Sequence, residues 1–414
     1  MCLRPGCVEK GMDKMDIRTV KDIDVASKKV LVRVDFNVPM DKDGTIRDDT
    51  RIKVCLPTIR YLIERHAKVI LCAHLGRPDG KVVESLRMAP VAKHLSKLLG
   101  KPVEPLSDCV GPTVEKAVSA MKDGDVVMLE NLRFHPEEKK NDPAFAKDLS
   151  KLADIYVNDA FSASHRAHAS IVGVTKYLPS VAGFLMEKEL KMLGNLLQNP
   201  EKPFAAVVGG AKVSDKLEVL DHILTKVNLF LIGGGMSATF FKSEGYGVGN
   251  SPVEDDRLEY VKDLREKAHA SGIKLLLPTD VVVTENIDGS SPARTVSANE
   301  IPDGWAIADI GPETISTYIR ELGKCKTVFW NGPLGVFEVK KFSNGTREIA
   351  EALARMNATT VVGGGSTTEA VNSLGLEGKM SHVSTGGGAT LEFLSGKALP
   401  GVIALEEASQ RVKA

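Results

Sequence analysis

The sequence predicts an α/β protein with two domains, each built around a mostly parallel sheet. Short apolar runs rich in β-branched residues alternate with longer helix-like segments, which is typical of parallel strands joined by crossover helices. The chain has 414 residues, more than a single hydrophobic core comfortably serves. A helix-like segment followed by a proline-bracketed connection lies near the middle, where we expect a domain junction and a hinge.

The expected junction rests on the spacing of apolar residues in the middle of the chain. These residues recur every three or four positions, beginning at Ala182 and ending at Leu197, which predicts a helix. Pro200 and Pro203 stop this helix because proline lacks an amide hydrogen and clashes with the preceding turn. One more crossover helix inside a single large α/β domain is the alternative. The expected division is residues 1–180, a linking helix and hinge at 181–202, and residues 203–414, the last few returning to the first domain.

Composition argues against several classes of protein. Lysine plus arginine equals aspartate plus glutamate, at 54 each, so the overall charge does not favour nucleic acid or a membrane surface as a partner. No apolar run approaches the roughly 20 residues of a membrane-spanning helix. The N-terminus lacks the apolar core of a signal peptide, so we expect a cytoplasmic enzyme. If translation begins at Met12 or Met15, we expect residues 1–11 to be non-native or disordered.

The cysteines are scattered and form no CxxC pair. This pattern indicates free thiols in a reducing compartment, without a zinc site. We therefore expect no metal held by protein side chains alone. The cysteines are Cys2, Cys7, Cys55, Cys72, Cys109 and Cys325.

Polar residues follow each strand predicted in the first half of the chain, and one more begins the next helix. The carboxyl ends of parallel strands lie along one edge of a sheet, so these residues should share a rim. Guanidinium groups bind carboxylate and phosphate oxygens in a bidentate manner, so the arginines predict a small, multiply charged anion as ligand. Taken singly, each arginine is explained as a solvated surface residue, but their repeated placement at strand ends weakens that explanation. The predicted strands are 30–34, 68–73, 126–129 and 155–157, and the rim residues are Asp35, Asn37, Arg51, His74, Arg77, Arg133 and Arg166.

In the second half, the predicted strands end in glycine-rich turns. Such turns let backbone amides approach a phosphate, often at the N-terminus of a helix. Four of them on one edge predict a polyphosphate or nucleotide site, although connections between strands and helices also need glycine for geometry alone. Lys212 and Lys216 are four residues apart, so on a helix they would project from one face towards the same ligand. The turns lie at 209–210, 233–235, 363–365 and 386–388.

The segment FWNGPLGVFE ends in Glu338. A carboxylate beside a nucleotide accepts hydrogen bonds from ribose hydroxyls, and an ordinary surface acid is the alternative. The chain contains no P-loop motif, no HRD catalytic loop and no GxSxG motif. The predicted site is therefore built for charge neutralisation rather than covalent catalysis.

The motifs taken together resemble those of one known family. The chain contains, in this order, RVDFNVP, HLGRP, LENLRFH, VNDAFSASHRAH, GGAKVSDK, GGGM, WNGPLGVFE and HVSTGGGAT. In order and approximate spacing, from roughly Val20 to the C-terminus, they are similar to the phosphoglycerate kinase family. The resemblance implies two Rossmann-like domains that face each other across a cleft, joined by a central helix and closing about a hinge.

The resemblance also implies an activity. It is the reversible transfer of the acyl phosphate of 1,3-bisphosphoglycerate to magnesium-ADP, which gives 3-phosphoglycerate and ATP in glycolysis. Mg²⁺ would be bound together with ADP or ATP. The implied partners are these small molecules, with no nucleic acid or membrane, and the implied state is a monomer.

The resemblance assigns roles to individual residues. Phosphoglycerate would bind the seven rim residues named above. Arg51 and Lys212 would act on the transferred phosphoryl group, helped by the backbone amides of the turn that contains Gly386 and Gly387. The rest of the nucleotide site would consist of Lys216, Gly311, Asn331, Glu338, Gly364, Gly365, Ser366 and Thr367.

Two positions depart from the family pattern. Ser366 stands where the family usually has an aspartate that helps to hold magnesium, so we expect weaker or altered cation binding unless Thr367 or Glu369 compensates. Ser162 stands where the family usually has glycine, and we expect a small local effect. Two alternatives to an active kinase follow: a family member inactivated through Ser366, and a two-domain protein that only binds a phosphorylated metabolite.

Overall fold

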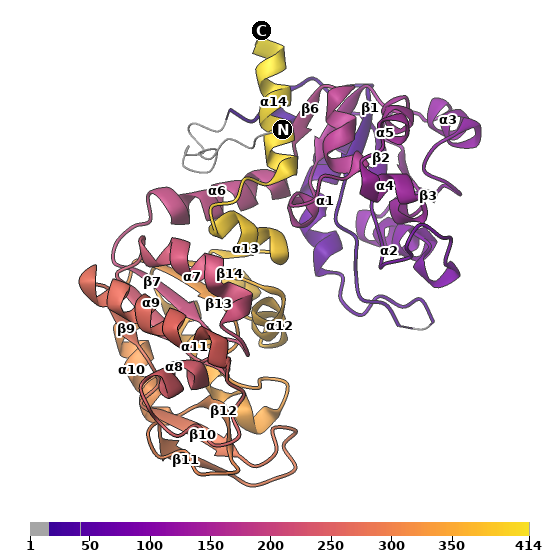
Figure 1. The fold of residues 1–414 in the computed structure, drawn as a ribbon. Helices are drawn as coiled ribbons and strands as arrows, with labels where there is room; N and C mark the ends of the chain where they lie inside the picture. The colour runs from indigo at the N-terminus through magenta and orange to yellow at the C-terminus, as the bar shows by residue number, and fades with distance from the viewer. Residues whose placement is uncertain (1–15, 42, 414) are drawn as a thin grey trace. The chain divides into compact units, whose positions relative to one another are not determined.

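The computed structural model describes residues 16–41 and 43–413, shown in Figure 1. The expected leader, with Cys2 and Cys7, lies outside the described residues, as do the possible start residues Met12 and Met15. The chain forms two compact units. Unit 1 comprises the chain up to Lys191 together with the segment from Ala398 onward, and unit 2 comprises Met192–Lys397. Across the described residues, every helix is too short or too polar to cross a membrane.

Unit 1 is built on a parallel sheet with the strand order β3-β4-β2-β1-β5-β6. The central strand β1 pairs with β2 and β5, so that Val30 lies beside Val69 on one side and Ile155 on the other. The four strands predicted here are confirmed to within one residue at each end, whereas the edge strands β3 and β6 were not predicted. The strands are β1 Lys29–Arg33, β2 Lys68–Cys72, β3 Glu104–Pro105, β4 Val126–Met128, β5 Ile155–Asn158 and β6 Ser180–Ala182.

Helices cover both faces of this sheet. Val30 and Val32 of β1 pack with residues of α1 and α2 in one core, whereas Leu31 packs with residues of α3 and α5 in a second core. Alternate residues of β1 therefore point into different cores, as expected for a strand whose central residues are all apolar. The helices of unit 1 are α1 Thr50–Glu64, α2 Ala89–Leu99, α3 Pro112–Ser119, α4 Pro136–Lys140, α5 Pro143–Ser150 and α14 Pro400–Lys413.

The C-terminal helix α14 belongs to unit 1 although unit 2 precedes it in the chain (Figure 1). Three hydrogen bonds hold it there. The amide of Gly401 donates to the carbonyl of Ser164 over 2.8 Å, the guanidinium of Arg411 donates to the carbonyl of Thr175 over 2.6 Å, and the Ser409 hydroxyl accepts from the amide of Arg18 over 2.9 Å.

Unit 2 contains a second parallel sheet, with the strand order β15-β14-β13-β7-β8-β9, and a smaller antiparallel sheet, with the order β11-β10-β12. The prediction of mostly parallel sheets is confirmed, but the antiparallel sheet was not predicted. The strands are β7 Phe204–Val208, β8 Leu229–Ile232, β9 Lys274–Leu276, β10 Asp280–Thr284, β11 Ala293–Ser297, β12 Ala306–Ile310, β13 Thr327–Asn331, β14 Thr359–Gly363 and β15 His382–Val383. The helices are α7 Leu217–Leu224, α8 Ser237–Ser243, α9 Leu258–Ala270, α10 Pro312–Leu322, α11 Asn344–Arg355, α12 Gly365–Ser373 and α13 Gly388–Leu394.

Helix α6, Phe184–Gln198, contains the boundary between the units. The prediction that Ala182 begins this helix is wrong, because Ala182 pairs with Asn158 as the last residue of strand β6. The turn into the helix needs glycine at 183, where a Cβ atom would lie 2.2 Å from Oδ1 of Asp159. That oxygen instead accepts a hydrogen bond of 2.8 Å from the amide of Leu185, in the first turn of α6.

Candidate functional site

The carboxyl edge of the unit 1 sheet gathers the polar residues predicted for the anion site. Strands β4, β2, β1 and β5 are neighbours in the sheet, and each leads into one part of the set. Asp35 and Asn37 follow β1, His74 and Arg77 follow β2, Arg133 lies in the short helix η3, Leu132–Phe134, that follows β4, and Arg166 follows β5. Arg51 is the second residue of helix α1, at the position predicted for it.

A pocket of about 390 Å³ opens at this edge and is strongly basic. Arg133 is buried, and this burial, together with the nearby charges of Arg166 and Arg33, lowers the pKa of its guanidinium to about 10. Like charges held this close repel one another, and an anion with several negative oxygens would relieve that repulsion. The pocket is lined by Arg77, Asp79, Arg133, Lys139 and Arg166.

His74 is held in one tautomer by a buried arginine. Nη2 of Arg33 lies 3.0 Å from Nδ1 of His74, and a guanidinium can only donate. Nδ1 therefore accepts, and the ring proton lies on Nε2. Burial, reinforced by the charge of Arg33, holds the pKa of His74 well below its ordinary value, so the imidazole is a neutral donor.

Sequence reasoning missed Arg33 and the residues behind it. Nε of Arg33 donates to the hydroxyl of Ser170 over 2.9 Å, and that hydroxyl donates to Glu138 over 2.6 Å. Both Arg33 and Glu138 are about 1% exposed. A signal was available for Arg33, since a lone charge inside a strand that is buried on both faces must have a partner.

Asp35 connects two residues that the sequence singled out separately. Its Oδ2 accepts hydrogen bonds from Nη1 of Arg51 and from the hydroxyl of Ser162. Its Oδ1 accepts from the amide of Asn37 over 3.2 Å. The side chain of Ser162 thus helps to fix the carboxylate that holds Arg51, a contact that glycine could not make.

The carboxyl edge of the parallel sheet in unit 2 carries the glycine-rich turns, which follow β7 and β8 on one side of β13, and β14 and β15 on the other. Gly364, at the end of β14, has a φ of +94°, and a Cβ atom there would lie 2.5 Å from Nδ2 of Asn331. Asn331, the last residue of β13, donates from Nδ2 to the carbonyl of Gly363 over 2.7 Å. The absence of a side chain at Gly364 therefore lets the turn after β14 pack closely against the end of β13.

Lys216 lies beside these turns. Its Nζ donates to Oδ1 of Asn331, and burial lowers the pKa of this lysine from 10.5 to about 8. The prediction that Lys212 and Lys216 share one face of a helix is wrong. Lys212 is exposed in an irregular segment, and helix α7 begins only at Leu217, because the backbone of Lys216 leaves the helical conformation at φ −131° and ψ 2°.

The first turn of α12 contributes hydroxyl groups. The hydroxyl of Thr367 is buried and accepts a hydrogen bond of 2.6 Å from the amide of Gly332. Ser366 and Gly365 are exposed beside it. Residues 365–368 include no carboxylate, so this turn offers Mg²⁺ only neutral oxygens. That donor set fits an ion held chiefly by nucleotide phosphates and water.

The other residues predicted for the nucleotide and the transferred group lie in several different segments of unit 2. Gly311 lies between β12, a strand of the antiparallel sheet, and the first residue of α10, and a Cβ atom there would lie 2.2 Å from the carboxylate of Asp280. Glu338 is exposed in a turn before the short helix η9, Lys340–Phe342. Gly387 has a φ of +54° and precedes α13. The amide of Gly386, predicted to donate to the transferred group, donates to the Ser384 hydroxyl over 3.1 Å.

Comparison with known proteins places this arrangement in a family. Residues 20–397 match the sequence profile described as "Phosphoglycerate kinase". The chain is 54% identical over 389 residues to a phosphoglycerate kinase of Moorella thermoacetica, covering 94% of this chain and 99% of the relative. It is 56% identical over 388 residues to one from Pelotomaculum thermopropionicum, covering 94% and 98% of the two chains.

Solved structures agree with the sequence comparison. The phosphoglycerate kinase from Coxiella burnetii superposes with a TM-score of 0.86 at 40% identity, covering 94% of this chain and 99% of that one. The enzyme from Pyrococcus horikoshii superposes with a TM-score of 0.84 at 35% identity, covering 95% and 100%. The chain therefore belongs to the phosphoglycerate kinase family.

Proposed function

We propose that this protein catalyses the reversible transfer of a phosphoryl group from 1,3-bisphosphoglycerate to ADP, giving 3-phosphoglycerate and ATP. The observation that carries the proposal is the basic pocket of unit 1, whose arginines converge from the ends of separate strands. A ligand with a phosphate and a carboxylate matches such an excess of positive charge. Family membership and the lysine beside the glycine turns of unit 2 support the nucleotide as the second substrate.

The residues of unit 1 bind and orient phosphoglycerate in this proposal. Arg77, Arg133 and Arg166 neutralise the phosphate that stays on the substrate. His74 donates its Nε2 proton to a substrate oxygen, and Asp35 and Asn37 orient the substrate hydroxyl together with Arg51. Nη1 of Arg133 donates to the carbonyl of Gly76 over 2.8 Å, and His74 contacts the buried guanidinium of Arg33. These two donors therefore need little rearrangement when the substrate binds.

In the chemical step, a β-phosphate oxygen of ADP forms a bond to the acyl phosphorus while the bond from phosphorus to the carboxyl oxygen breaks. The leaving group departs as a stable carboxylate, so no general acid is required. Arg51 and Lys212 neutralise the equatorial oxygens of the transferred group, and Lys216 neutralises the nucleotide phosphates. Magnesium, bound with the nucleotide, would offset further phosphate charge.

The amides of Gly386 and Gly387 complete the donors around the transferred group. The Gly386 amide must first leave the Ser384 hydroxyl, so the proposal includes a rearrangement of this turn. The nucleotide site is completed by Gly311, Asn331, Glu338, Gly364, Gly365, Ser366 and Thr367.

We also propose that the sites of units 1 and 2 come together during the reaction, with α6 and the connection after it as the hinge. Transfer between bound substrates requires the reacting oxygens to be held in line, and closure would exclude water that otherwise hydrolyses the acyl phosphate. A monomeric enzyme of cytoplasmic glycolysis is the setting expected from the family.

The test is ATP formation from 1,3-bisphosphoglycerate and ADP, repeated across a magnesium titration. Turnover that saturates with magnesium supports the kinase. Binding of both substrates without transfer at any magnesium concentration would overturn it and favour an inactive family member, for which the exposed hydroxyl at Ser366 is the specific reason.

A further inference from the structure

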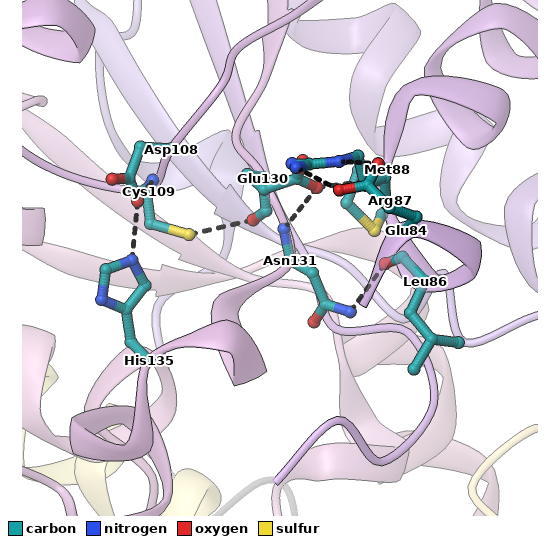
Figure 2. Close-up of polar contacts among 9 residues, drawn as sticks. All are labelled: Glu84, Leu86, Arg87, Met88, Asp108, Cys109, Glu130, Asn131 and His135. Atoms are coloured by element: carbon teal, nitrogen blue, oxygen red, sulfur yellow. Dashed lines mark hydrogen bonds and ion pairs between the residues drawn. The ribbon is translucent and has the colours of Figure 1, made fainter. Parts of the chain in front are cut away.

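Three possible metal ligands meet in unit 1, as Figure 2 shows. Asp108 and Cys109 lie in the loop between β3 and α3, and His135 lies between η3 and α4. One ligand atom from each residue lies within 4.8 Å of the others, and the described part of the chain holds no second group of three such residues at this separation.

The imidazole and the thiol are held in fixed positions. The ring of His135 stacks on Phe145, with 5.0 Å between centroids and 29° between planes, and its Nε2 lies 2.6 Å from Oδ1 of Asp108. The thiol of Cys109 is buried and donates to the carbonyl of Glu130 over 3.0 Å. Two of the three ligand atoms therefore need little ordering before an ion binds.

The segment that anchors the thiol is itself rigidly held, as Figure 2 shows. The carboxylate of Glu130 accepts hydrogen bonds from Arg87 over 2.9 Å, from the amide of Met88 over 2.8 Å and from the amide of Asn131 over 2.9 Å. Metal sites commonly rely on such supporting contacts behind their ligands. The side chain of Asp108 is 52% exposed, and its Oδ1 also accepts a hydrogen bond of 2.7 Å from the amide of Cys109.

We infer that Asp108, Cys109 and His135 bind a divalent transition metal of the zinc class. Thiolate, imidazole and carboxylate are the ligands that zinc takes in proteins, and three of them leave a fourth position for water. On binding, the thiol proton passes to solvent, the sulfur–metal bond forms, and no electron is transferred. This inference departs from the sequence-based expectation that side chains alone hold no metal.

The ligand atoms must move to admit the ion, since Sγ of Cys109 is placed only within 4.8 Å of the other two. Tetrahedral coordination at zinc distances separates neighbouring nitrogen and oxygen ligands by about 3.4 Å, whereas His135 and Asp108 are 2.6 Å apart. The exposed Asp108 carboxylate can move outward by this small difference. The competing explanation is that Asp108 and His135 form an ordinary ion pair and that Cys109 is merely a buried thiol.

A cobalt titration of the full chain distinguishes these explanations. Cys2→Ser and Cys7→Ser form the background, so that neither of these thiols contributes. We expect Co²⁺ to produce a thiolate-to-cobalt charge-transfer band that saturates at one ion per chain and is displaced by Zn²⁺. Cys109→Ser should abolish the band. His135→Gln, at a partly exposed position, should weaken cobalt binding by at least about tenfold.

Two matched variants control for general effects. His94→Gln removes an imidazole that also pairs with a carboxylate, Asp49, at 3.0 Å, and Cys325→Ser removes another buried thiol. Both should retain the full band. The inference fails if the background protein gives no thiolate band, or if the band survives unchanged in His135→Gln.

Discussion

Nη2 of Arg33 lies 3.0 Å from Nδ1 of His74, with both side chains buried. This contact predicts that His74 remains neutral, with its proton on Nε2, across the physiological range, because protonation would place a second charge beside a buried guanidinium. Nitrogen-15 NMR spectra recorded from about pH 5.5 to pH 8 should show a non-titrating Nε2–H tautomer. His74→Gln identifies the signal, and a ring that titrates near 6.5 would contradict the assignment.

Arg51 is expected to contribute more to turnover than to binding. Its guanidinium is 36% exposed and held by Asp35, so it can turn to the transferred phosphoryl group. Arg51→Ala should lower kcat by about 100-fold, which corresponds to about 3 kcal/mol of lost transition-state stabilisation. Steady-state kinetics provide the measurement. Arg47→Ala removes an exposed arginine that pairs with Asp41 and should leave kcat unchanged. A raised KM at unaltered kcat would show that Arg51 only binds.

Lys216 predicts a pH dependence of nucleotide binding. Burial lowers the pKa of Lys216 to about 8, so the fraction of charged lysine falls as pH rises through that value. The affinity for ADP should therefore decline between about pH 7 and pH 9, where an unperturbed lysine would remain charged. Calorimetry at several pH values measures this. Lys216→Arg, which stays charged, should bind with a flatter profile, and an equally flat profile in the unsubstituted protein would argue against a nucleotide contact.

Because the side chain of Ser366 is uncharged, we expect the protein itself to contribute little to magnesium binding. Ser366→Asp adds an anionic oxygen in the first turn of α12 and should lower the magnesium concentration that gives half-maximal ATP formation. Ser373→Asp adds the same charge at the other end of that helix and should leave the magnesium requirement unchanged. Identical requirements in Ser366→Asp and the unsubstituted protein would mean that the missing carboxylate has no role.

The local sequence pattern was sufficient to predict the parallel sheets and the polar residues at their edges. An apolar run and the residues that follow it can be recognised within a short segment of the chain. It did not predict the contact of Arg33 with Ser170, which joins residues 137 positions apart. The antiparallel sheet of β10, β11 and β12 was missed, and β11 is largely exposed, so its residues lack the continuous apolar run of the other strands. The spacing of Lys212 and Lys216 suggested a helix, but spacing alone does not reveal where a helix begins.

The position of α14 has a consequence for how the chain is made. Most of unit 1 is synthesised first, and all of unit 2 follows. The helix that contacts Ser164, Thr175 and Arg18 is synthesised only afterwards. Unit 2 is continuous in the chain and can fold as soon as it emerges. Unit 1 must wait with an uncovered surface until α14 has been synthesised. A chain that is truncated before Pro400 and released from the ribosome should therefore be cut by protease in unit 1 and resist cleavage in unit 2.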